Sequence, residues 1–251
     1  HAKLNLALHV TGKSSKLHKL ETIVTFVDLH DIIYIKTSNS RDHEISFTGK
    51  FSKNIKKDNT IIRLLRLLEK EKILKDKKFN IRVFKNIPQK SGMGGGSINA
   101  SSIISFFISK KIIEIKNKQL IKLSKSIGSD VILGINPTNT ILSSNGKISK
   151  YKKRINLYPL IVKPNFGCST KYIFSKVKYY SKSKFNLPKQ SMFKVDYLKT
   201  LNNDLEIVAF KRYPRLKNIK LFLMNVSNSI FVRMSGSGSS IVAYFHSKKA
   251  C

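Results

Sequence analysis

Tryptophan is absent from this 251-residue chain, and cysteine, acidic residues and long apolar runs are scarce. The two cysteines, Cys168 and Cys251, show no metal-ligand spacing and are too few for a disulfide scaffold, which favours free thiols in a reducing cytosol. The longest apolar run, IISFFI at 103–108, is far shorter than the roughly 18 residues that a membrane-spanning helix needs. No signal peptide opens the chain. We therefore expect a cytoplasmic protein without a membrane anchor, and 41% of hydrophobic residues is enough for a substantial core.

The scarcity of acidic residues leaves a formal net charge of +34, from 48 basic against 14 acidic side chains. A positive field of this kind attracts phosphate groups, so nucleic-acid binding and an enzyme with anionic substrates are both open. The basic residues are spread along the whole chain, and only eight of them are arginine, the better side chain for reading bases. The abundance of Lys, Ile, Asn, Phe, Tyr and Ser also matches A/T-rich codons. The composition therefore favours an enzyme over a nucleic-acid-binding module.

Alternating and helical apolar patterns occur in both halves of the chain. The opening AKLNLALHV places Leu4, Leu6 and Leu8 on one face and Lys3 and Asn5 on the other, which predicts a half-buried strand followed by a turn at 11–16. Further strands are expected at 21–28, 31–36, 79–83, 157–164 and 241–245, and helices at 59–74, 103–108, 119–127 and 198–210. The stretch 171–191 is expected to be an exposed loop or a mobile helix. The polar stretch 143–154 is expected to connect two lobes, at 1–145 and 146–251, of an α+β fold.

Glycine is also scarce, yet four of the 12 glycines fall within 92–96, in the stretch NIPQKSGMGGGSINASS at 86–102. Because glycine lacks Cβ, its backbone N–H can approach an anion closely, and a helix that follows adds its positive dipole end. Ser97 and Asn99 fall in the first turn of that helix, where a hydroxyl can reach phosphate or Mg²⁺. The stretch predicts a phosphate-binding loop. It is not a Walker A loop, which needs Lys after the last glycine, nor the dinucleotide fingerprint, which needs glycine at Ser97.

The stretch IPQKSGMGGGSINAS resembles the PxxxGLGGGSSNAA loop of the GHMP kinase superfamily, in its 4-diphosphocytidyl-2-C-methyl-D-erythritol kinase family. Further stretches resemble that family in the same order: AKLNLALHVTGK its PAKLNLFLxVTGR, LHKLETIVTFVDLHD its GYHxLxTLFxFLDLxD, DNTIIRLLRLL its DNLIxRAARLL, IGSDV its LGADVP, and RMSGSGSS its xSGSGAT. The resemblance extends from residue 2 to about residue 245. It implies an N-terminal lobe like the second domain of ribosomal protein S5, a ferredoxin-like C-terminal lobe, and substrates in the cleft between them.

The resemblance also implies the catalytic residues and the ATP site. Asp130 would be the base that takes the proton from the erythritol 2-hydroxyl, and Lys3 would keep it ionised and orient the hydroxyl. From the residues alone, Asp130 is equally a helix-capping carboxylate and Lys3 is one of many solvated lysines. Mg²⁺ is expected with ATP, with Ser97 as its candidate contact. The ATP-binding residues implied are Asn59, Pro88, Gly92, Met93, Gly94, Gly95, Gly96, Ser97 and Asn99.

The substrate-binding residues implied are Asn5, His18, Thr170, Phe174, Gly236, Ser237 and Gly238. By resemblance, His18 reads cytosine and Phe174 stacks on it, whereas from the residues alone they are a surface histidine and a core phenylalanine. Leu17 stands where the family has a tyrosine that stacks on the other face of the cytosine. Stacking on a base contributes about 1–3 kcal/mol, so weaker nucleotide binding is expected.

These residues predict a kinase that uses ATP to phosphorylate the 2-hydroxyl of 4-diphosphocytidyl-2-C-methyl-D-erythritol, in the non-mevalonate route to isoprenoid precursors. Two alternatives stay open: a GHMP kinase acting on a small alcohol such as homoserine or mevalonate, and a basic RNA-binding module without catalysis. A small alcohol needs no base-reading pocket, so His18 and Phe174 favour the first prediction. A monomer or a homodimer without a membrane partner is expected. Because the chain starts at His1 inside a strand pattern, we also expect a natural start further upstream.

Overall fold

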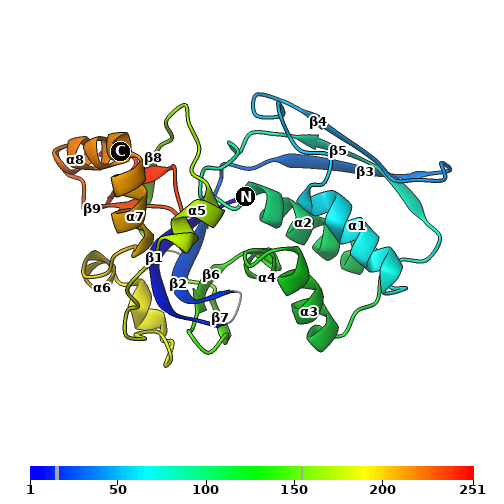
Figure 1. Cartoon of the computed structure of the whole chain (residues 1–251), viewed down its shortest axis with the longest axis horizontal. Helices are drawn as coiled ribbons and strands as arrows, with labels where there is room; N and C mark the ends of the chain where they lie inside the picture. The colour runs from blue at the N-terminus through cyan, green and yellow to red at the C-terminus, as the bar shows by residue number, and fades with distance from the viewer. Residues whose placement is uncertain (15–16, 154) are drawn as a thin grey trace. The chain divides into compact units, whose positions relative to one another are not determined.

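The computed structural model describes residues 1–14, 17–153 and 155–251, which form two compact units (Figure 1). The first unit consists of His1–Lys3, Val27–Gln89 and Gly94–Pro137, and the second of Leu4–Phe26, Lys90–Met93 and Thr138–Cys251. The sequence predicts one division at 145–146, whereas these units alternate along the chain. They alternate because Leu8 and Val10, near the start of the chain, share a hydrophobic core with residues of the last third, such as Leu205 and Ile241.

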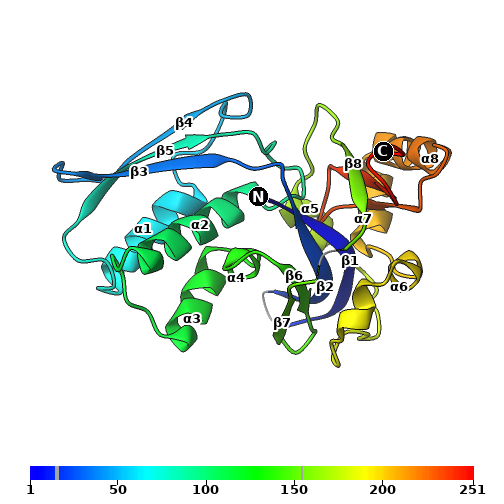
Figure 2. The ribbon, with the colours of Figure 1, turned by 180° about the vertical axis from the view of Figure 1, so that it is seen from behind.

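The first unit has two layers, a sheet and a layer of helices on one of its faces (Figures 1 and 2). Its sheet has the order β3 (Ile32–Ser38), β5 (Lys78–Phe84), β4 (Glu44–Thr48), with β5 antiparallel to β3 and parallel to β4. The helices are α1 (Thr60–Lys70), α2 (Gly95–Ser109), α3 (Asn117–Ile127) and α4 (Val131–Gly134). Along β5, Phe79, Ile81 and Val83 are buried and the residues between them are exposed, so one face of the sheet packs on the helices.

Helices α1 and α3 begin and end where the sequence gives local reasons. Asn59 caps α1, because its Oδ1 accepts hydrogen bonds from the N–H groups of Ile61 at 3.0 Å and Ile62 at 3.2 Å. Gly128 ends α3, as the sequence predicts. The helix expected at 103–108 is the second half of α2, which already begins at the glycine loop.

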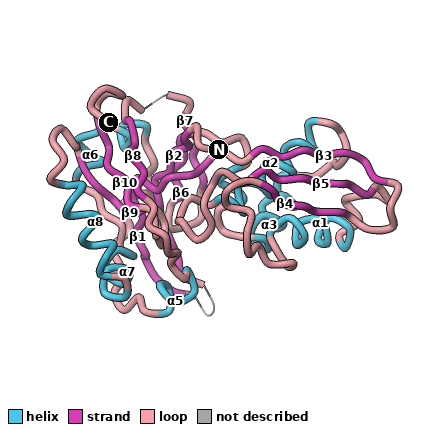
Figure 3. Tube along the Cα trace, turned by 90° about the horizontal axis from the view of Figure 1, so that it is seen from above, coloured by secondary structure: helices cyan, strands magenta, loops and turns pink. Residues whose placement is uncertain are grey.

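The second unit contains two sheets and the remaining helices; Figure 3 shows its strands and helices from above. The four-stranded sheet has the order β1 (Ala2–Lys13), β2 (His18–Val27), β6 (Asn139–Leu142), β7 (Ile148–Tyr151). The three-stranded antiparallel sheet has the order β8 (Tyr158–Val162), β10 (Ile241–Phe245), β9 (Phe231–Met234). The helices are α5 (Thr170–Ser175), the 3₁₀ helix η1 (Gln190–Phe193), α6 (Val195–Lys199), α7 (Leu205–Arg212) and α8 (Pro214–Met224).

Strand β1 is buried on both faces, whereas the sequence predicts a half-buried strand. Lys3, Asn5 and His9 on its polar face are only 2%, 2% and 1% exposed. Buried polar side chains need polar partners, and His9 finds one in Glu21, at 3.0 Å between Nδ1 and Oε1. Polar side chains of this strand therefore lie inside the molecule, which gives them the fixed positions that a functional site requires.

Several other elements differ from the sequence-based expectations. The polar connector at 143–154 includes strand β7, and the helix expected at 198–210 is divided into α6 and α7. In the stretch 171–191, Phe185 is completely buried, so this stretch is anchored rather than a free loop. The turn at 11–16 includes Ser15 and Lys16, which lie outside the described residues, as does Arg154 of the connector. None of the helices described here is long and apolar enough to span a membrane.

Candidate active site

The glycine loop of the first unit opens the N-terminus of α2. Gly94 is the N-cap residue and has a φ of +70°, a left-handed conformation that favours glycine. A Cβ at Gly94 would lie 3.3 Å from Oδ2 of Asp130 and 3.3 Å from Cε of Lys3. The glycine therefore does two things: it allows the turn, and it lets the backbone at the helix N-terminus come next to a lysine and a carboxylate. A helix N-terminus with exposed N–H groups is suited to bind a phosphate group.

Lys3 and Asp130 form an ion pair beside that helix terminus. The Lys3 ammonium lies 3.1 Å from Asp130 Oδ2, and the side chains are 2% and 29% exposed. Asp130 directly precedes α4, whose Val131 carbonyl oxygen lies 2.6 Å from the Ser101 hydroxyl of α2. The buried Lys3 and this link between α2 and α4 fix the carboxylate in place, while its remaining exposure leaves it accessible to a hydroxyl group. The pair that the sequence predicts as catalytic is thus brought together.

A second ion pair, which the sequence reasoning missed, lies below the glycine loop. Lys85 pairs with Asp31, and a Cβ at Gly95 would lie 3.4 Å from the Lys85 ammonium. Asp31 Oδ2 also accepts a hydrogen bond of 2.9 Å from the Nδ2 group of Asn99. Asn99, expected to touch ATP, is only 4% exposed, so its amide holds the first turn of α2 onto this pair. The signal that could have found the site is the Asp of VDLHD, a carboxylate directly before a strand.

The remaining predicted ATP residues of the first unit surround the start of α2 and α1. The Thr60 hydroxyl donates to the Gly96 carbonyl oxygen at 2.8 Å, which joins the two helix N-termini. Asn59 caps α1, and its Nδ2 group donates to the Lys56 carbonyl oxygen at 3.2 Å. The Ser97 hydroxyl lies beside Gly128, where a Cβ would be 3.1 Å from Ser97 Oγ. Pro88 is half-buried just before the loop.

In the second unit, Gly92 lies against the second glycine stretch, Gly236, Ser237 and Gly238, which connects β9 to β10. A Cβ at Gly92 would lie 1.9 Å from the Ser235 carbonyl oxygen, so only glycine fits there. The Ser235 hydroxyl donates to the Gly92 carbonyl oxygen at 3.0 Å and accepts from the Asn5 N–H at 3.2 Å. Met93 is buried. The predicted residues Asn5, Gly92 and Gly236 are therefore neighbours in this unit.

The remaining predicted substrate residues of the second unit form two contacts. The Thr170 hydroxyl lies 2.8 Å from the Ser237 hydroxyl, which joins the start of α5 to the second glycine stretch. The rings of His18 and Phe174 have centroids 5.3 Å apart and are tilted by 38°. Partial burial, with a smaller contribution from Lys13, lowers the pKa of His18, so its imidazole is neutral at neutral pH. A neutral imidazole beside an aromatic ring is suited to bind an uncharged heterocycle.

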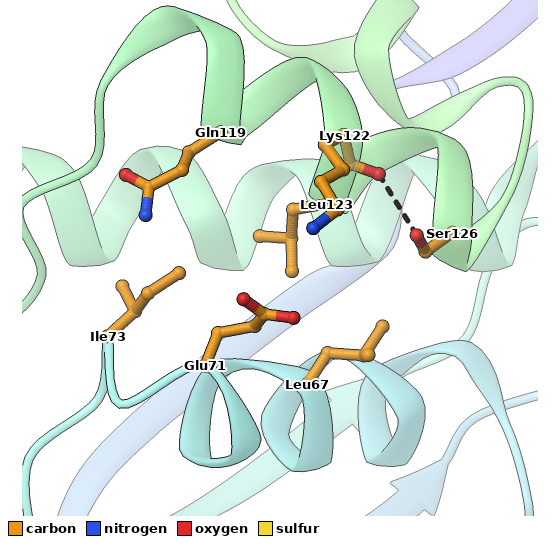
Figure 4. A pocket seen from close by; sticks show the side chains of 7 residues that line it. All are labelled: Leu67, Glu71, Ile73, Gln119, Lys122, Leu123 and Ser126. Atoms are coloured by element: carbon orange, nitrogen blue, oxygen red, sulfur yellow. Dashed lines mark hydrogen bonds between the residues drawn. The ribbon is translucent and has the colours of Figure 1, made fainter.

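A small cavity lies elsewhere in the first unit, between α1 and α3 (Figure 4). Its volume is about 140 Å³, and it is lined by Leu67, Glu71, Ile73, Gln119, Lys122, Leu123 and Ser126. These residues come from the C-terminal end of α1, whereas Thr60 at the N-terminal end contacts the glycine loop. The cavity is therefore separate from the phosphate loop. Within the described part of the chain, no group of three or more His, Cys, Asp and Glu side chains is arranged to hold a metal ion.

Comparisons with known proteins agree with this geometry. The family described as GHMP kinases N terminal domain matches residues 59–143, which include the glycine loop and Asp130. A 4-diphosphocytidyl-2-C-methyl-D-erythritol kinase of Pelagibacter ubique is 61% identical over 251 residues, 100% of this chain and 89% of that protein. The kinase of the same name from Francisella philomiragia is 31% identical over 95% of this chain and 83% of its own length.

Solved structures show the same fold. A crystal structure of 4-(cytidine 5'-diphospho)-2C-methyl-D-erythritol kinase matches with a TM-score of 0.76 at 22% identity, over 99% of this chain and 91% of that one. A homoserine kinase from Cytophaga hutchinsonii matches with a TM-score of 0.68 at 16% identity, over 99% of this chain and 86% of that one.

Fold and glycine loop together define the class, which is that of the GHMP kinases, and the expected two-lobed α+β fold is confirmed. Identity over the whole chain narrows the assignment. The chain belongs to the 4-diphosphocytidyl-2-C-methyl-D-erythritol kinase family of that superfamily.

Proposed function

We propose that this chain transfers the terminal phosphoryl group of ATP to the 2-hydroxyl of 4-diphosphocytidyl-2-C-methyl-D-erythritol, a step of the non-mevalonate route to isoprenoid precursors. One observation carries the proposal. The missing side chain of Gly94 brings the N-terminus of α2 into contact with both Lys3 and Asp130. Phosphoryl transfer needs an anion site next to a proton acceptor, and the first unit has both within one contact distance.

In this proposal each residue of the first unit has a defined task. Asp130 receives the proton of the attacking hydroxyl, and Lys3 holds the carboxylate in position through the 3.1 Å ion pair. The N–H groups of Gly95 and Gly96 at the start of α2 are the donors for phosphate oxygens. Mg²⁺, when bound with ATP, would neutralise charge on the phosphates, and the Ser97 hydroxyl is the group of this chain proposed to contact it.

The second unit supports a substrate with an aromatic base. His18 and Phe174 form a ring pair that is not part of a buried core, because both side chains are partly exposed. Thr170 and the second glycine stretch are the further residues proposed to contact the cytidylated substrate. The fold alone does not distinguish this substrate from homoserine, since a homoserine kinase shares the fold with a TM-score of 0.68. The 61% identity with the Pelagibacter kinase and the ring pair both favour the cytidylated alcohol.

The test is a substrate panel with Mg-ATP in which ADP release is followed. We expect release with 4-diphosphocytidyl-2-C-methyl-D-erythritol and none with homoserine, mevalonate or RNA. Release with homoserine or mevalonate but not with the cytidylated alcohol would refute the assignment. Salt-sensitive RNA binding that persists in Asp130→Ala, without ADP release from any alcohol, would favour the binding-module alternative.

We further propose that the enzyme works in the reducing cytoplasm, where Cys168 and Cys251 stay as the free thiols that the structure contains. A monomer and a homodimer are both compatible with the proposed reaction. Sedimentation of the purified chain distinguishes them.

A further inference from the structure

A third aromatic ring lies next to the pair of His18 and Phe174. The Tyr180 ring has its centroid 6.4 Å from that of His18, at an interplanar angle of 53°. Phe174 comes from α5, His18 from the start of β2, and Tyr180 from the irregular stretch between α5 and η1. Three different segments of the second unit therefore place rings around one imidazole. Tyr180 is 47% exposed, so its ring is available to a ligand.

The backbone next to Tyr180 is held tightly, although the stretch has no regular secondary structure. The N–H group of Ser181 donates to the Val10 carbonyl oxygen of β1 at 2.8 Å, and its hydroxyl donates to Asp204 Oδ2 at 2.8 Å. A few residues further on, the N–H groups of Lys184 and Phe185 donate to the buried Glu21 carboxylate at 2.8 and 3.1 Å. Tyr180 thus sits at the start of an anchored stretch of backbone.

The anchor itself is built deep in the second unit. Glu21 is completely buried, and the backbone N–H groups of Lys184 and Phe185 and the side chain of His9 lower the pKa of its carboxyl group against the opposing effect of burial. Phe185 is buried as well and stacks on His9 with ring centroids 5.1 Å apart. Such a clamp keeps the backbone of this stretch from moving away from β1 and β2. The ring that it presents loses little further freedom when it contacts a ligand, which favours binding.

We propose that Tyr180 is a specificity-determining residue that contacts the aromatic base of the substrate, together with Phe174 and the edge of His18. The inference rests on the proposed function, because it assigns a residue to the base of the cytidylated alcohol. Aromatic stacking on a base is worth about 1–3 kcal/mol, which corresponds to about 5- to 150-fold in affinity. Leu17, next to His18, has an aliphatic side chain that is 74% exposed and cannot supply a stacking ring.

The chain offers a matched control next door. Tyr179 is the preceding residue and is 86% exposed, so Tyr179→Ala removes the same side chain from the same stretch. We would compare Tyr180→Ala, Tyr180→Phe and Tyr179→Ala by steady-state kinetics, and by calorimetric binding of cytidine 5'-diphosphate. Thermal unfolding of each variant checks that the fold is intact.

We expect Tyr180→Ala to raise KM for the cytidylated alcohol and Kd for cytidine 5'-diphosphate by about 5- to 150-fold, with KM for ATP and the melting temperature unchanged. Tyr180→Phe keeps the ring and should stay within about threefold of the wild type, as should Tyr179→Ala. An active wild type with equal Kd values for Tyr180→Ala and Tyr179→Ala overturns this inference alone. A wild type that neither binds cytidine 5'-diphosphate nor phosphorylates the cytidylated alcohol overturns the proposed function, and this inference with it.

Discussion

Lys85 and Asp31 form an ion pair that is almost completely removed from solvent, with side chains 6% and 0% exposed. The Asp31 carboxylate also accepts the N–H groups of Asn86 and Ile87, each at 2.8 Å, and the amide of Asn99 at 2.9 Å. It therefore joins the chain that leaves β5 to the first turn of α2, and the glycine loop lies between these two points. The proposed phosphate site is positioned by a buried charge pair that itself need not touch the nucleotide.

Replacing the lysine of this pair should be costly. Lys85→Met leaves the carboxylate of Asp31 buried without its cation, and breaking such a pair typically costs about 3–5 kcal/mol. Urea unfolding followed by circular dichroism measures the change in the free energy of unfolding. Lys78→Met is the control, because the Lys78–Glu69 pair is 26% and 33% exposed and should contribute less than about 1 kcal/mol. Equal losses for both variants would contradict a buried role for Lys85.

The proposed base can be removed without changing its shape. Asp130→Asn should lower kcat by about 10²- to 10⁴-fold, because the amide cannot accept the hydroxyl proton. Binding of an ATP analogue should change little, since the proposed phosphate donors are the N–H groups of α2. Lys3→Met should also lower kcat, because Asp130 loses the partner that orients it. Calorimetry with the analogue separates the two effects, and an Asp130→Asn variant with wild-type kcat would sink the mechanism.

The two thiols should react at very different rates. Burial raises the pKa of Cys168 to about 11, and its side chain is 1% exposed, whereas Cys251 is exposed. Because the thiolate is the reactive form, iodoacetamide at pH 8 should label Cys251 and leave Cys168 unmodified in the native protein. Peptide mass spectrometry gives the extent of labelling at each site. In urea both should be labelled, and equal labelling without urea would show that Cys168 is accessible.

His43 should make the protein less stable in mild acid. Burial lowers the pKa of His43, although Glu69 acts in the opposite direction, and the Phe79 N–H donates to its Nδ1 at 3.1 Å. In the unfolded chain a histidine titrates near pH 6.5. As the pH falls below about 6.5, the unfolded state binds a proton that the native state does not, so the free energy of unfolding decreases. It stops decreasing once the pH passes the native pKa.

The measurement is urea unfolding between pH 7 and pH 5. His43→Gln should flatten the pH dependence relative to the wild type. His246→Gln changes an exposed histidine and should leave the wild-type slope as it is. A His43→Gln slope equal to that of the wild type would show that another group is responsible.

Local patterns predicted the elements of the first unit well. Asn59 before an apolar helical stripe identified the start of α1, and Gly128 identified the end of α3, because caps act over a few residues. The alternation of Phe79, Ile81 and Val83 identified β5 and its inner face. The short strands β4, β6, β7 and β9 were not identified, since four or five residues carry too little periodicity to stand out.

Long-range contacts could not be predicted from such patterns. Nothing in the residues around Asn99 indicates Asp31, which is 68 positions away and receives its amide hydrogen bond. The burial of Lys3 is likewise invisible in an alternating strand, where a lysine is normally assigned to the solvent face. The resemblance to a kinase family supplied the pairing of Lys3 with Asp130, while Tyr180 matched no motif.

Because the two compact units alternate along the chain, no single cut would separate them into independent pieces. Arg233 near the C-terminus donates hydrogen bonds to the carbonyl oxygens of Leu6 and Leu198, a reach of 227 positions in the first case. The first strand of the second unit therefore has to wait for the last residues of the chain before its contacts can form. During synthesis on the ribosome, that strand remains without its final neighbours almost until release, and slow folding with a need for chaperone protection is the expected result.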